Sequence, residues 1–385
     1  MIHVFLGNKL ISSDTIVPLM MEVHRRAPSR PIHFYCFHAR TCRMLRANTV
    51  LWDAIGAIGR FHCMAGEGLG AWRPLRRARI ALLLLRLTFR ALFGRDYFVH
   101  FKALNDGPLS LLARVHPRRT VFFETNGWGY DKLMMEKIAT IGRARAISTR
   151  AGRGAVIVGF SADWPEFRHP DNRGKVHYRI APSHQSPAWL EFVTGNAQRF
   201  FSRAFAEAGL PESDAVIVYV LGWFGPMDFM RAPDSSERLL HRTLRVLAEE
   251  SDGLPVFVKP HFISDLAVLE RALAPFRNRP IVVSWLHPAV LASRAAAFVC
   301  NYYSTTLGDA ALMGAPTIEF TDYSDKALAA TGGGSMRGEH VSHFINGDEA
   351  RFRRVFNDLA RRRTTSAAPA HRGNAANPVV ELLSG

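Results

Sequence analysis

The chain has 385 residues, of which 48% are hydrophobic, and its 49 lysines and arginines against 33 acidic residues give a formal net charge of +16. This length and hydrophobic content exclude a disordered chain and predict two domains, each with its own core. The N-terminal sequence MIHVFL is typical of a first strand and not of a signal peptide. The cysteines lack the spacing of a disulfide framework or a zinc site, so we expect reduced thiols and a cytoplasmic protein: Cys36, Cys42, Cys63 and Cys300.

The excess of positive charge favours a polyanionic partner such as an acidic lipid, an acidic polysaccharide or a nucleic acid. A basic surface without a specific partner is the alternative. The sequence has no Cys/His finger, no aromatic strand of the RNA-recognition type and no basic zipper. Nucleic acid is therefore the least favoured of these partners.

In the first part of the chain, short apolar runs alternate with segments of helical periodicity. We expect strands at 2–6, 32–37, 60–63, 97–102 and 120–124. We expect helices near 14–26, 40–56, 74–93 and 107–115. This alternation is typical of a parallel sheet that is covered by helices on both faces.

A second series of the same kind begins near residue 215. Its strands are expected at 215–221, 256–259, 281–284, 297–301 and 317–320, and its helices near 234–250, 264–276, 287–294 and 306–313. Helical periodicity also appears near 188–208, within a less regular middle stretch. The sequence therefore predicts an α/β protein of two doubly wound, Rossmann-like domains, over 1–190 and 191–345. We expect a C-terminal helix over 346–363 and a flexible tail over 364–385.

The segment 73–95 holds seven arginines and no acidic residue. At 100° per residue, Arg79, Arg86 and Arg90 fall on one helix face, although Leu83 intrudes on it. The segment is too interrupted by charge to span a bilayer. One prediction is an amphipathic helix over 74–93 that lies on an anionic inner leaflet. The alternative is an ordinary sheet-covering helix with a solvated arginine face.

Polar residues follow two of the buried strands in the second series. One strand ends in Lys259-Pro260-His261, and another is followed by Ser304-Thr305-Thr306 at the expected start of a short helix. Because the carboxyl ends of parallel strands meet at one edge of a sheet, we expect a cation, an imidazole and several hydroxyls to lie together there. This combination predicts an anion site, with a nucleotide phosphate as its ligand. The alternatives are an ordinary helix cap and a structural histidine.

The order of these motifs resembles the C-terminal domain of bacterial GT-B glycosyltransferases that build capsules and teichoic acids. KPH is followed by a strand, S-T-T, a short helix and a Gly-x-Pro stop. The group includes polysialyltransferases, capsule-linker Kdo transferases and CDP-glycerol glycerophosphotransferases. The resemblance covers about 250–325. It implies a GT-B-like fold of two domains facing across a cleft, with an acceptor on the N-terminal side and a nucleotide-sugar on the C-terminal side.

In this group the histidine and the Ser/Thr motif hold the phosphate of a CMP- or CDP-activated donor. The resemblance thus implies a donor-phosphate site made by Lys259, His261, Ser304, Thr305 and Thr306. The candidates for the donor nucleoside are Asp309, Glu319 and His287. Two positions depart from the pattern: Phe262 stands where a proline usually follows the histidine, and Asp309 stands where related chains often have glutamate. His287 precedes a proline at a helix start, which is also a common structural arrangement.

An inverting transferase of this type needs a base in its N-terminal domain to deprotonate the acceptor hydroxyl. Glu124 ends the strand at 120–124, and Asp106 follows the preceding strand; Glu124 is preferred. His261 is expected to act in catalysis by neutralising the departing phosphate. No spacing typical of metal ligands appears, so we expect a metal-independent enzyme with no cofactor besides the nucleotide-sugar.

The interpretation is a glycosyltransferase that uses a nucleotide-activated sugar, CMP-linked by resemblance, to build a bacterial capsular or other surface polysaccharide. Its expected acceptor is lipid-linked or a polysaccharide. Two alternatives stay open. One is a UDP-sugar-dependent transferase or epimerase with the same fold, and the other is a non-catalytic polyanion-binding protein.

Overall fold

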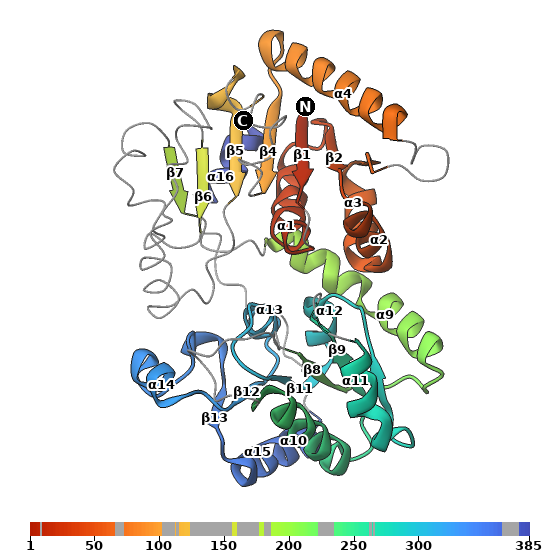
Figure 1. Ribbon diagram of the computed structural model, residues 1–385, viewed down its shortest axis with the longest axis vertical. Helices are drawn as coiled ribbons and strands as arrows, with labels where there is room; N and C mark the ends of the chain where they lie inside the picture. Colours follow the sequence, from red (N-terminus) through yellow and green to blue (C-terminus); the bar gives the residue numbers. More distant parts are fainter. Residues whose placement is uncertain are drawn as a thin grey trace. The chain divides into compact units, whose positions relative to one another are not determined.

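The computed structural model describes residues 1–7, 10–65, 73–101, 112, 115–123, 156–159, 177–180, 186–221, 235–261, 264, 266–363 and 377–385. These residues form two compact units. The first contains the described residues up to Trp189 together with 377–385, and the second contains those from Leu190 to Arg363. Each unit is built on one parallel sheet (Figure 1).

The sheet of the first unit has seven parallel strands in the order β3-β2-β1-β4-β5-β6-β7. The chain builds outward from β1 to β3 and then places β4 on the other side of β1, so the sheet is doubly wound. Its central strands are nearly continuous runs of buried apolar residues, as expected for parallel strands covered on both faces. The strands are β1 (Ile2–Leu6), β2 (Ile32–Cys36), β3 (Arg60–Cys63), β4 (Tyr97–Phe101), β5 (Thr120–Phe123), β6 (Val156–Gly159) and β7 (His177–Ile180).

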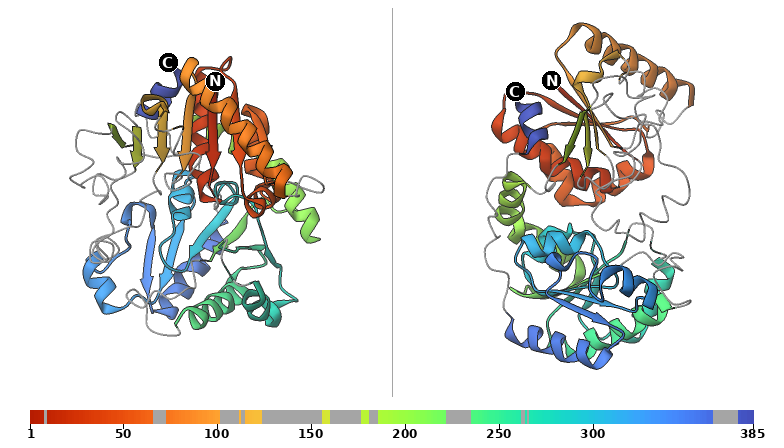
Figure 2. Two further views of the ribbon diagram at one scale, coloured as in Figure 1. Left: turned by 45° about the horizontal axis from the view of Figure 1, so that its top comes forward. Right: turned by 90° about the vertical axis from the view of Figure 1, so that its left-hand side faces the viewer.

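Helices cover this sheet on both faces, with α1 and α4 on opposite sides (Figure 2). α4 packs its inner side on the face that carries Phe5, Tyr35 and Phe98. α1 contacts α3 and the C-terminal helix α16. The helices are α1 (Ile11–Arg26), α2 (Ala39–Ala47), α3 (Thr49–Ile58), α4 (Arg73–Phe93), the 3₁₀ turn η3 (Pro117–Arg119) and α16 (Pro378–Ser384). α9 (Pro187–Ala208) begins in this unit and continues into the second.

The sheet of the second unit has six parallel strands in the order β10-β9-β8-β11-β12-β13. The same outward-and-return path makes it doubly wound, and its direction changes between β8 and β11. The strands are β8 (Val216–Val220), β9 (Val256–Lys259), β10 (Ile281–Val283), β11 (Ala295–Cys300), β12 (Thr317–Thr321) and β13 (His343–Asn346). The helices are α10 (Ser235–Glu250), α11 (Leu266–Leu273), η5 (Ala274–Phe276), α12 (Pro288–Ala292), α13 (Thr306–Leu312), α14 (Asp325–Thr331), η6 (Gly338–His340) and α15 (Glu349–Arg362).

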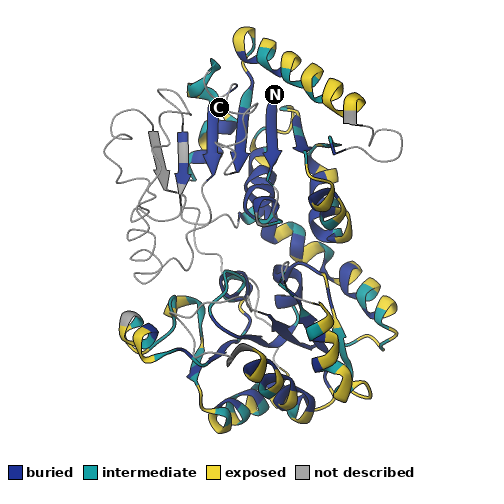
Figure 3. Cartoon of the chain, viewed as in Figure 1, coloured by how far each residue is buried: buried dark blue, intermediate teal, exposed yellow. Residues whose placement is uncertain are grey.

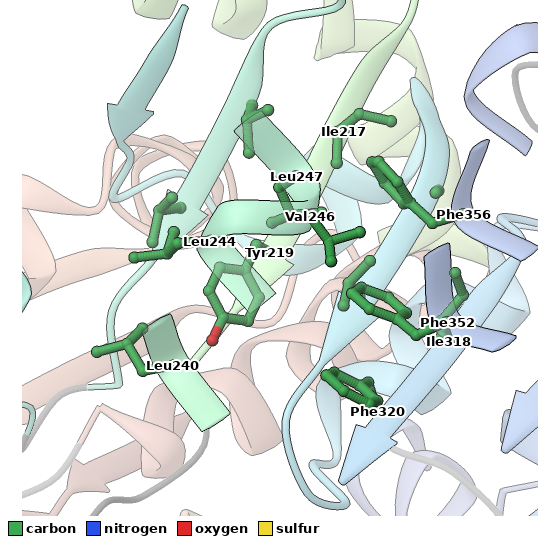
Figure 4. Packing of buried hydrophobic residues seen from close by; sticks show 14 of the residues in the cluster. Ile217, Tyr219, Leu240, Leu244, Val246, Leu247, Ile318, Phe320, Phe352 and Phe356 are labelled. Atoms are coloured by element: carbon green, nitrogen blue, oxygen red, sulfur yellow. The ribbon is translucent and has the colours of Figure 1, made fainter. Parts of the chain in front are cut away.

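The core of the second unit lies between its sheet and the helices α10 and α15. Tyr219 of β8 and Phe320 of β12 face Leu244 of α10 and Phe352 of α15 (Figure 4). On the other face of the sheet, Phe257 of β9 packs edge-to-face against two phenylalanines of α9. The central strands β8, β9, β11 and β12 are therefore buried on both faces, and the elements are dark blue toward the sheet in Figure 3.

The strands expected in the two series are present to within two residues at each described end, and the doubly wound α/β prediction is confirmed. The helix expected over 40–56 is instead two helices that meet at Asn48. The Asn48 side chain accepts a hydrogen bond from the amide of Leu51 at 3.2 Å and so starts α3. An asparagine that caps in this way competes with continuation of the preceding helix.

The prediction of a flexible tail over 364–385 is wrong for the last nine residues. Pro378–Ser384 forms α16, in which Val379, Val380 and Leu383 are fully buried. Asn377 caps this helix through a hydrogen bond from the amide of Val379 at 3.0 Å. A helix this short gains its stability from packing, so sequence periodicity alone gives little sign of it.

Candidate functional site

The carboxyl edge of the sheet in the second unit brings the predicted donor-binding residues into one row. Val220 at the end of β8 is paired with Lys259 of β9 on one side and with Cys300 of β11 on the other. Cys300 is in turn paired with Glu319 of β12. Adjacent strands lie about 4.8 Å apart, so Lys259 and Cys300 are separated by about 10 Å across β8. This edge is also where the winding direction of the sheet reverses, the usual position of a ligand in such folds.

The Lys-Pro-His segment continues directly from β9. The carbonyl of Lys259 accepts a hydrogen bond from the amide of Leu221 at 3.0 Å, which is the last bond between β9 and β8. Pro260 is buried, and the amide of Ser264 donates to the carbonyl of His261 at 2.9 Å, so the chain turns immediately after the histidine. Lys259 and His261 are both half-buried at this edge.

The connection from β11 to α13 is held rigidly. Asn301 has no exposed surface, and its side-chain amide donates to the carbonyl of Phe320 at 2.9 Å and to the hydroxyl of Thr243 at 3.0 Å. The next residue, Tyr302, has a φ of 63°, in the left-handed region that non-glycine residues rarely adopt. Its hydroxyl donates to the carboxylate of Asp322 beyond the end of β12. Backbone strain of this kind is maintained only where surrounding contacts fix it.

Ser304, Thr305 and Thr306 follow this connection, and all three are half-buried. The hydroxyl of Thr306 lies 3.0 Å from that of Ser304, and the amide of Thr306 lies 3.4 Å from the same oxygen. Thr305 occupies the cap position in its backbone but makes no side-chain cap bond. Ser304 therefore supplies the side chain over the first turn of α13, and the expected stop is present at Gly314 with a φ of 76°.

Glu319, in the middle of β12 and level with the last residue of β11, is a fully buried carboxylate. One oxygen accepts a hydrogen bond from the hydroxyl of Tyr323 at 2.6 Å, and the other accepts one from the hydroxyl of Ser335. Burial raises the pKa of Glu319 to about 7 in spite of these bonds. The Tyr323 hydroxyl also accepts the amide of Tyr303 at 2.8 Å, so the carboxylate is connected to the β11–α13 segment.

The Ser335 contact also positions the glycine-rich segment after α14. Gly332 and Gly333 have φ values of 68° and 81°, which end the helix in a conformation that favours glycine. The Thr331 hydroxyl donates to the carbonyl of Gly334 at 2.9 Å. This segment is thus bonded to the carboxyl edge of the sheet.

The two remaining candidates for binding the nucleoside, His287 and Asp309, are both buried. His287 is 1% exposed, and its Nδ1 accepts a hydrogen bond from the amide of Ala289 at 3.1 Å, which caps α12. Asp309 lies in α13 and is 8% exposed. A ligand role for either residue stays a prediction.

Sequence reasoning did not single out several residues that complete this edge. Tyr302 and Tyr303 immediately precede the Ser/Thr motif, and Asp322 and Tyr323 immediately follow β12. The Tyr303 hydroxyl also lies 3.0 Å from Nδ1 of His340. The sequence did hold a signal for them, since each pair lies within three residues of the end of a buried strand of the same parallel sheet.

The predicted bases, Glu124 and Asp106, lie outside the described residues. Within the described part of the chain, no group of His, Cys, Asp and Glu has the arrangement of a metal site. The edge itself combines a lysine, a histidine, partly exposed hydroxyls and a buried carboxylate. Such a set can bind a phosphate through its cation and its hydroxyl donors.

No protein-family model matches the sequence, and no curated protein sequence is significantly similar to it. Solved structures do resemble the fold. UDP-GlcNAc 2-epimerase from Methanocaldococcus jannaschii aligns with a TM-score of 0.55 and 11% identity, over 100% of this chain and 99% of that chain. The chain has a GT-B-like fold.

The Neisseria meningitidis UDP-GlcNAc 2-epimerase, solved with UDP-GlcNAc bound, aligns with a TM-score of 0.51 and 11% identity, over 99% of this chain and 98% of that chain. The E. coli heptosyltransferase WaaC with ADP aligns less closely, with a TM-score of 0.44 and 13% identity over 93% and 100% of the two chains. At these sequence identities, the similarity to the solved structures shows the fold of this chain alone.

Proposed function

We propose that this chain is a glycosyltransferase that binds a nucleotide-activated sugar at the carboxyl edge of the sheet in its second unit. One observation carries the proposal: β9, β11 and β12 run parallel in one sheet and bring three groups toward the same edge. These are Lys259 with His261 after β9, the Ser304–Thr306 segment after β11, and Glu319 within β12. The KPH and S-T-T motifs that resemble capsule and teichoic-acid transferases are therefore at the position where a doubly wound sheet binds ligands.

In this proposal, Lys259 and His261 stabilise the negative charge that develops on the departing phosphate, together with the hydroxyls of Ser304, Thr305 and Thr306. No metal is required for that role. Glu319, with Asp309 and His287 as further candidates, binds the nucleoside. The acceptor hydroxyl loses its proton to Glu124 or Asp106, and attack on the anomeric carbon from the opposite side inverts its configuration.

The finer features rest on the motif resemblance. We propose a CMP-linked sugar as donor, a lipid-linked or polysaccharide acceptor, and a role in building a bacterial capsular or other surface polysaccharide at the inner face of the cytoplasmic membrane. The net charge of +16 suits an anionic acceptor.

The test is ligand-dependent thermal stability of the full chain with CMP, CDP and UDP. CMP or CDP should raise the melting temperature of the wild type, and His261→Ala should abolish the shift. His241→Ala is the matched control. His241 is a half-exposed histidine on α10, a helix that covers one face of the same sheet, and it is not among the proposed ligand-binding residues. If none of the nucleotides stabilises the wild type, the proposal fails.

An epimerase acting on a UDP-sugar is the second candidate. Two of the solved structures that align with a TM-score above 0.5 are described as UDP-GlcNAc 2-epimerases. Incubation with UDP-GlcNAc alone, followed by proton NMR, separates the two candidates. Appearance of the C2 epimer without any acceptor would favour the epimerase, whereas a transferase leaves the sugar configuration of its unreacted donor unchanged.

A further inference from the structure

The outer side of α4 carries a stripe of apolar side chains that are not packed in the core. Nine large hydrophobic side chains are exposed in the described part of the chain, and six of them lie on this one helix. Leu82 and Leu85 are each 69% exposed and Phe93 is 74% exposed. The complete stripe is Leu75, Leu82, Leu85, Phe89, Leu92 and Phe93.

This stripe is separate from the side of α4 that packs on the sheet. The inner contacts come from Leu84, Leu87 and Ala91, which pack on Phe5, Tyr35 and Phe98. At 100° per residue the inner residues centre on the side opposite the stripe. α4 therefore has two apolar sides, and Figure 3 shows its outer side exposed along the helix. Core packing accounts for only one of them.

Arginines border the outer stripe. α4 contains six arginines and no acidic residue. Arg79 and Arg86 are exposed, and at 100° per residue they lie along one edge of the stripe. Arg90 is engaged within the fold, because its guanidinium donates to the carboxylate of Asp96. An exposed apolar stripe with a basic border has the composition of helices that lie in the interface of an anionic bilayer.

We propose that α4 docks this chain on an anionic membrane, with the outer stripe inserted among the lipid chains and the bordering arginines at the headgroups. Among the described residues, no helix is long and apolar enough to cross a bilayer, so α4 lies in the membrane plane. Charge decides between lipid and a second copy of the chain. A two-fold pairing of α4 with itself would place arginines of one copy near those of the other with no acidic partner on the helix, whereas anionic headgroups neutralise them.

This arrangement changes the sequence prediction in one respect. The sequence placed Arg79, Arg86 and Arg90 on one face of an amphipathic helix, and the structure adds that leucines and phenylalanines are exposed beside them. The insertion of apolar side chains, and not charge alone, should then determine binding. The proposal is independent of the enzymatic one, because membrane binding can be measured with no sugar nucleotide present.

The experiment is flotation of the full chain with two kinds of vesicle, phosphatidylcholine alone and phosphatidylcholine mixed with phosphatidylglycerol. The wild type should float with the anionic vesicles only. Leu82→Glu/Leu85→Glu should weaken binding at least about tenfold, since two inserted leucines are lost. Leu266→Glu/Trp285→Glu is the matched control, because it adds the same two charges at exposed apolar residues of the second unit, and it should bind like the wild type.

A second variant tests the arginine border. Arg79→Gln/Arg86→Gln keeps the apolar stripe and should weaken binding to the anionic vesicles about tenfold at low salt. Circular dichroism and sedimentation of each variant check that it stays folded. The proposal is overturned if the wild type fails to float, or if the leucine variant floats like the wild type. It is also overturned if the leucine variant converts a dimer to a monomer while no protein binds vesicles, since the stripe would then pair two copies.

Discussion

Glu319 is the residue whose ionisation the fold disfavours most clearly at the proposed site. Its carboxylate has no exposed surface, and burial raises its pKa from 4.5 to about 7. The folded protein therefore binds this proton more tightly than the unfolded chain does, and stability is lost as the pH rises from about 4.5 to about 7. A carboxyl group that titrates near neutrality can present either a donor or an acceptor to a ligand hydroxyl.

Glu319→Gln should remove this pH dependence. The amide can still accept from the Tyr323 hydroxyl and can donate to the oxygen of Ser335, so both contacts are retained. Relative to the variant, the wild type should lose on the order of 2 kcal/mol of stability between about pH 5 and about pH 8. Chemical denaturation midpoints of both proteins at the two pH values measure the difference. Parallel pH profiles would show that Glu319 keeps its ordinary pKa.

His100 on β4 contributes a pH dependence of stability with the opposite sign, because here stability is lost as the pH falls. Its ring is fully buried between Phe5 and Phe122, at centroid distances of 4.7 and 5.2 Å. Neither ring nitrogen has a hydrogen-bond partner among the described residues. Burial lowers the pKa of His100 from 6.5 to about 3, so it stays neutral in the folded protein while the unfolded chain gains a proton as the pH falls.

His100→Phe should therefore stabilise the protein and reduce its acid sensitivity. The wild type should lose about 2 kcal/mol relative to the variant between about pH 7 and about pH 5, as the unfolded histidine becomes protonated. A phenylalanine of similar shape also removes two buried polar atoms that lack described partners. Denaturation midpoints at both pH values provide the measurement, and a variant that is less stable than the wild type at pH 5 would contradict this account.

At the scale of elements, α16 shows how the end of the chain contributes to the first unit. Leu383 is fully buried, and its carbonyl accepts a hydrogen bond from Arg30. α16 contacts α1 and β7. The chain therefore returns after the second unit to complete the core of the first.

Leu383→Ala should destabilise the protein by about 2–4 kcal/mol, because it leaves a cavity under α16. Leu382→Ala is the matched control, since the neighbouring leucine is only half-buried, and it should cost roughly 1 kcal/mol or less. Thermal unfolding of both variants provides the comparison. Equal losses would mean that α16 does not pack as described.

Most of the strands could be predicted one by one from the sequence, for a physical reason. β1, β8 and β11 are short runs of apolar residues bounded by turns, and parallel strands buried on both faces have this composition. β6, β7 and β13 were not predicted. β13 is an edge strand, starts with His343 and ends with Asn346, and so lacks a continuous apolar run. α16 was missed because its burial depends on α1, which is distant in the sequence.

At the scale of the whole molecule, the site was predictable in part. The motifs identified Lys259, His261 and Ser304–Thr306, and the parallel topology placed them at one edge. Ser335 depended on a contact with Glu319, 16 residues away, which no local pattern encodes. Tyr303 and Tyr323 follow buried strands, and that position could have pointed to them. Two doubly wound sheets, each with a direction reversal, complete the GT-B-like architecture.

The most direct test of the central claim is hydrogen–deuterium exchange of the full chain with and without CDP. Binding at the carboxyl edge of the second sheet should slow exchange in the 301–306 connection, and His261→Ala should remove that protection. α1 and α16, in the first unit, should exchange as before. Protection confined to the first unit, or unchanged exchange at 301–306 when CDP is saturating, would contradict the account.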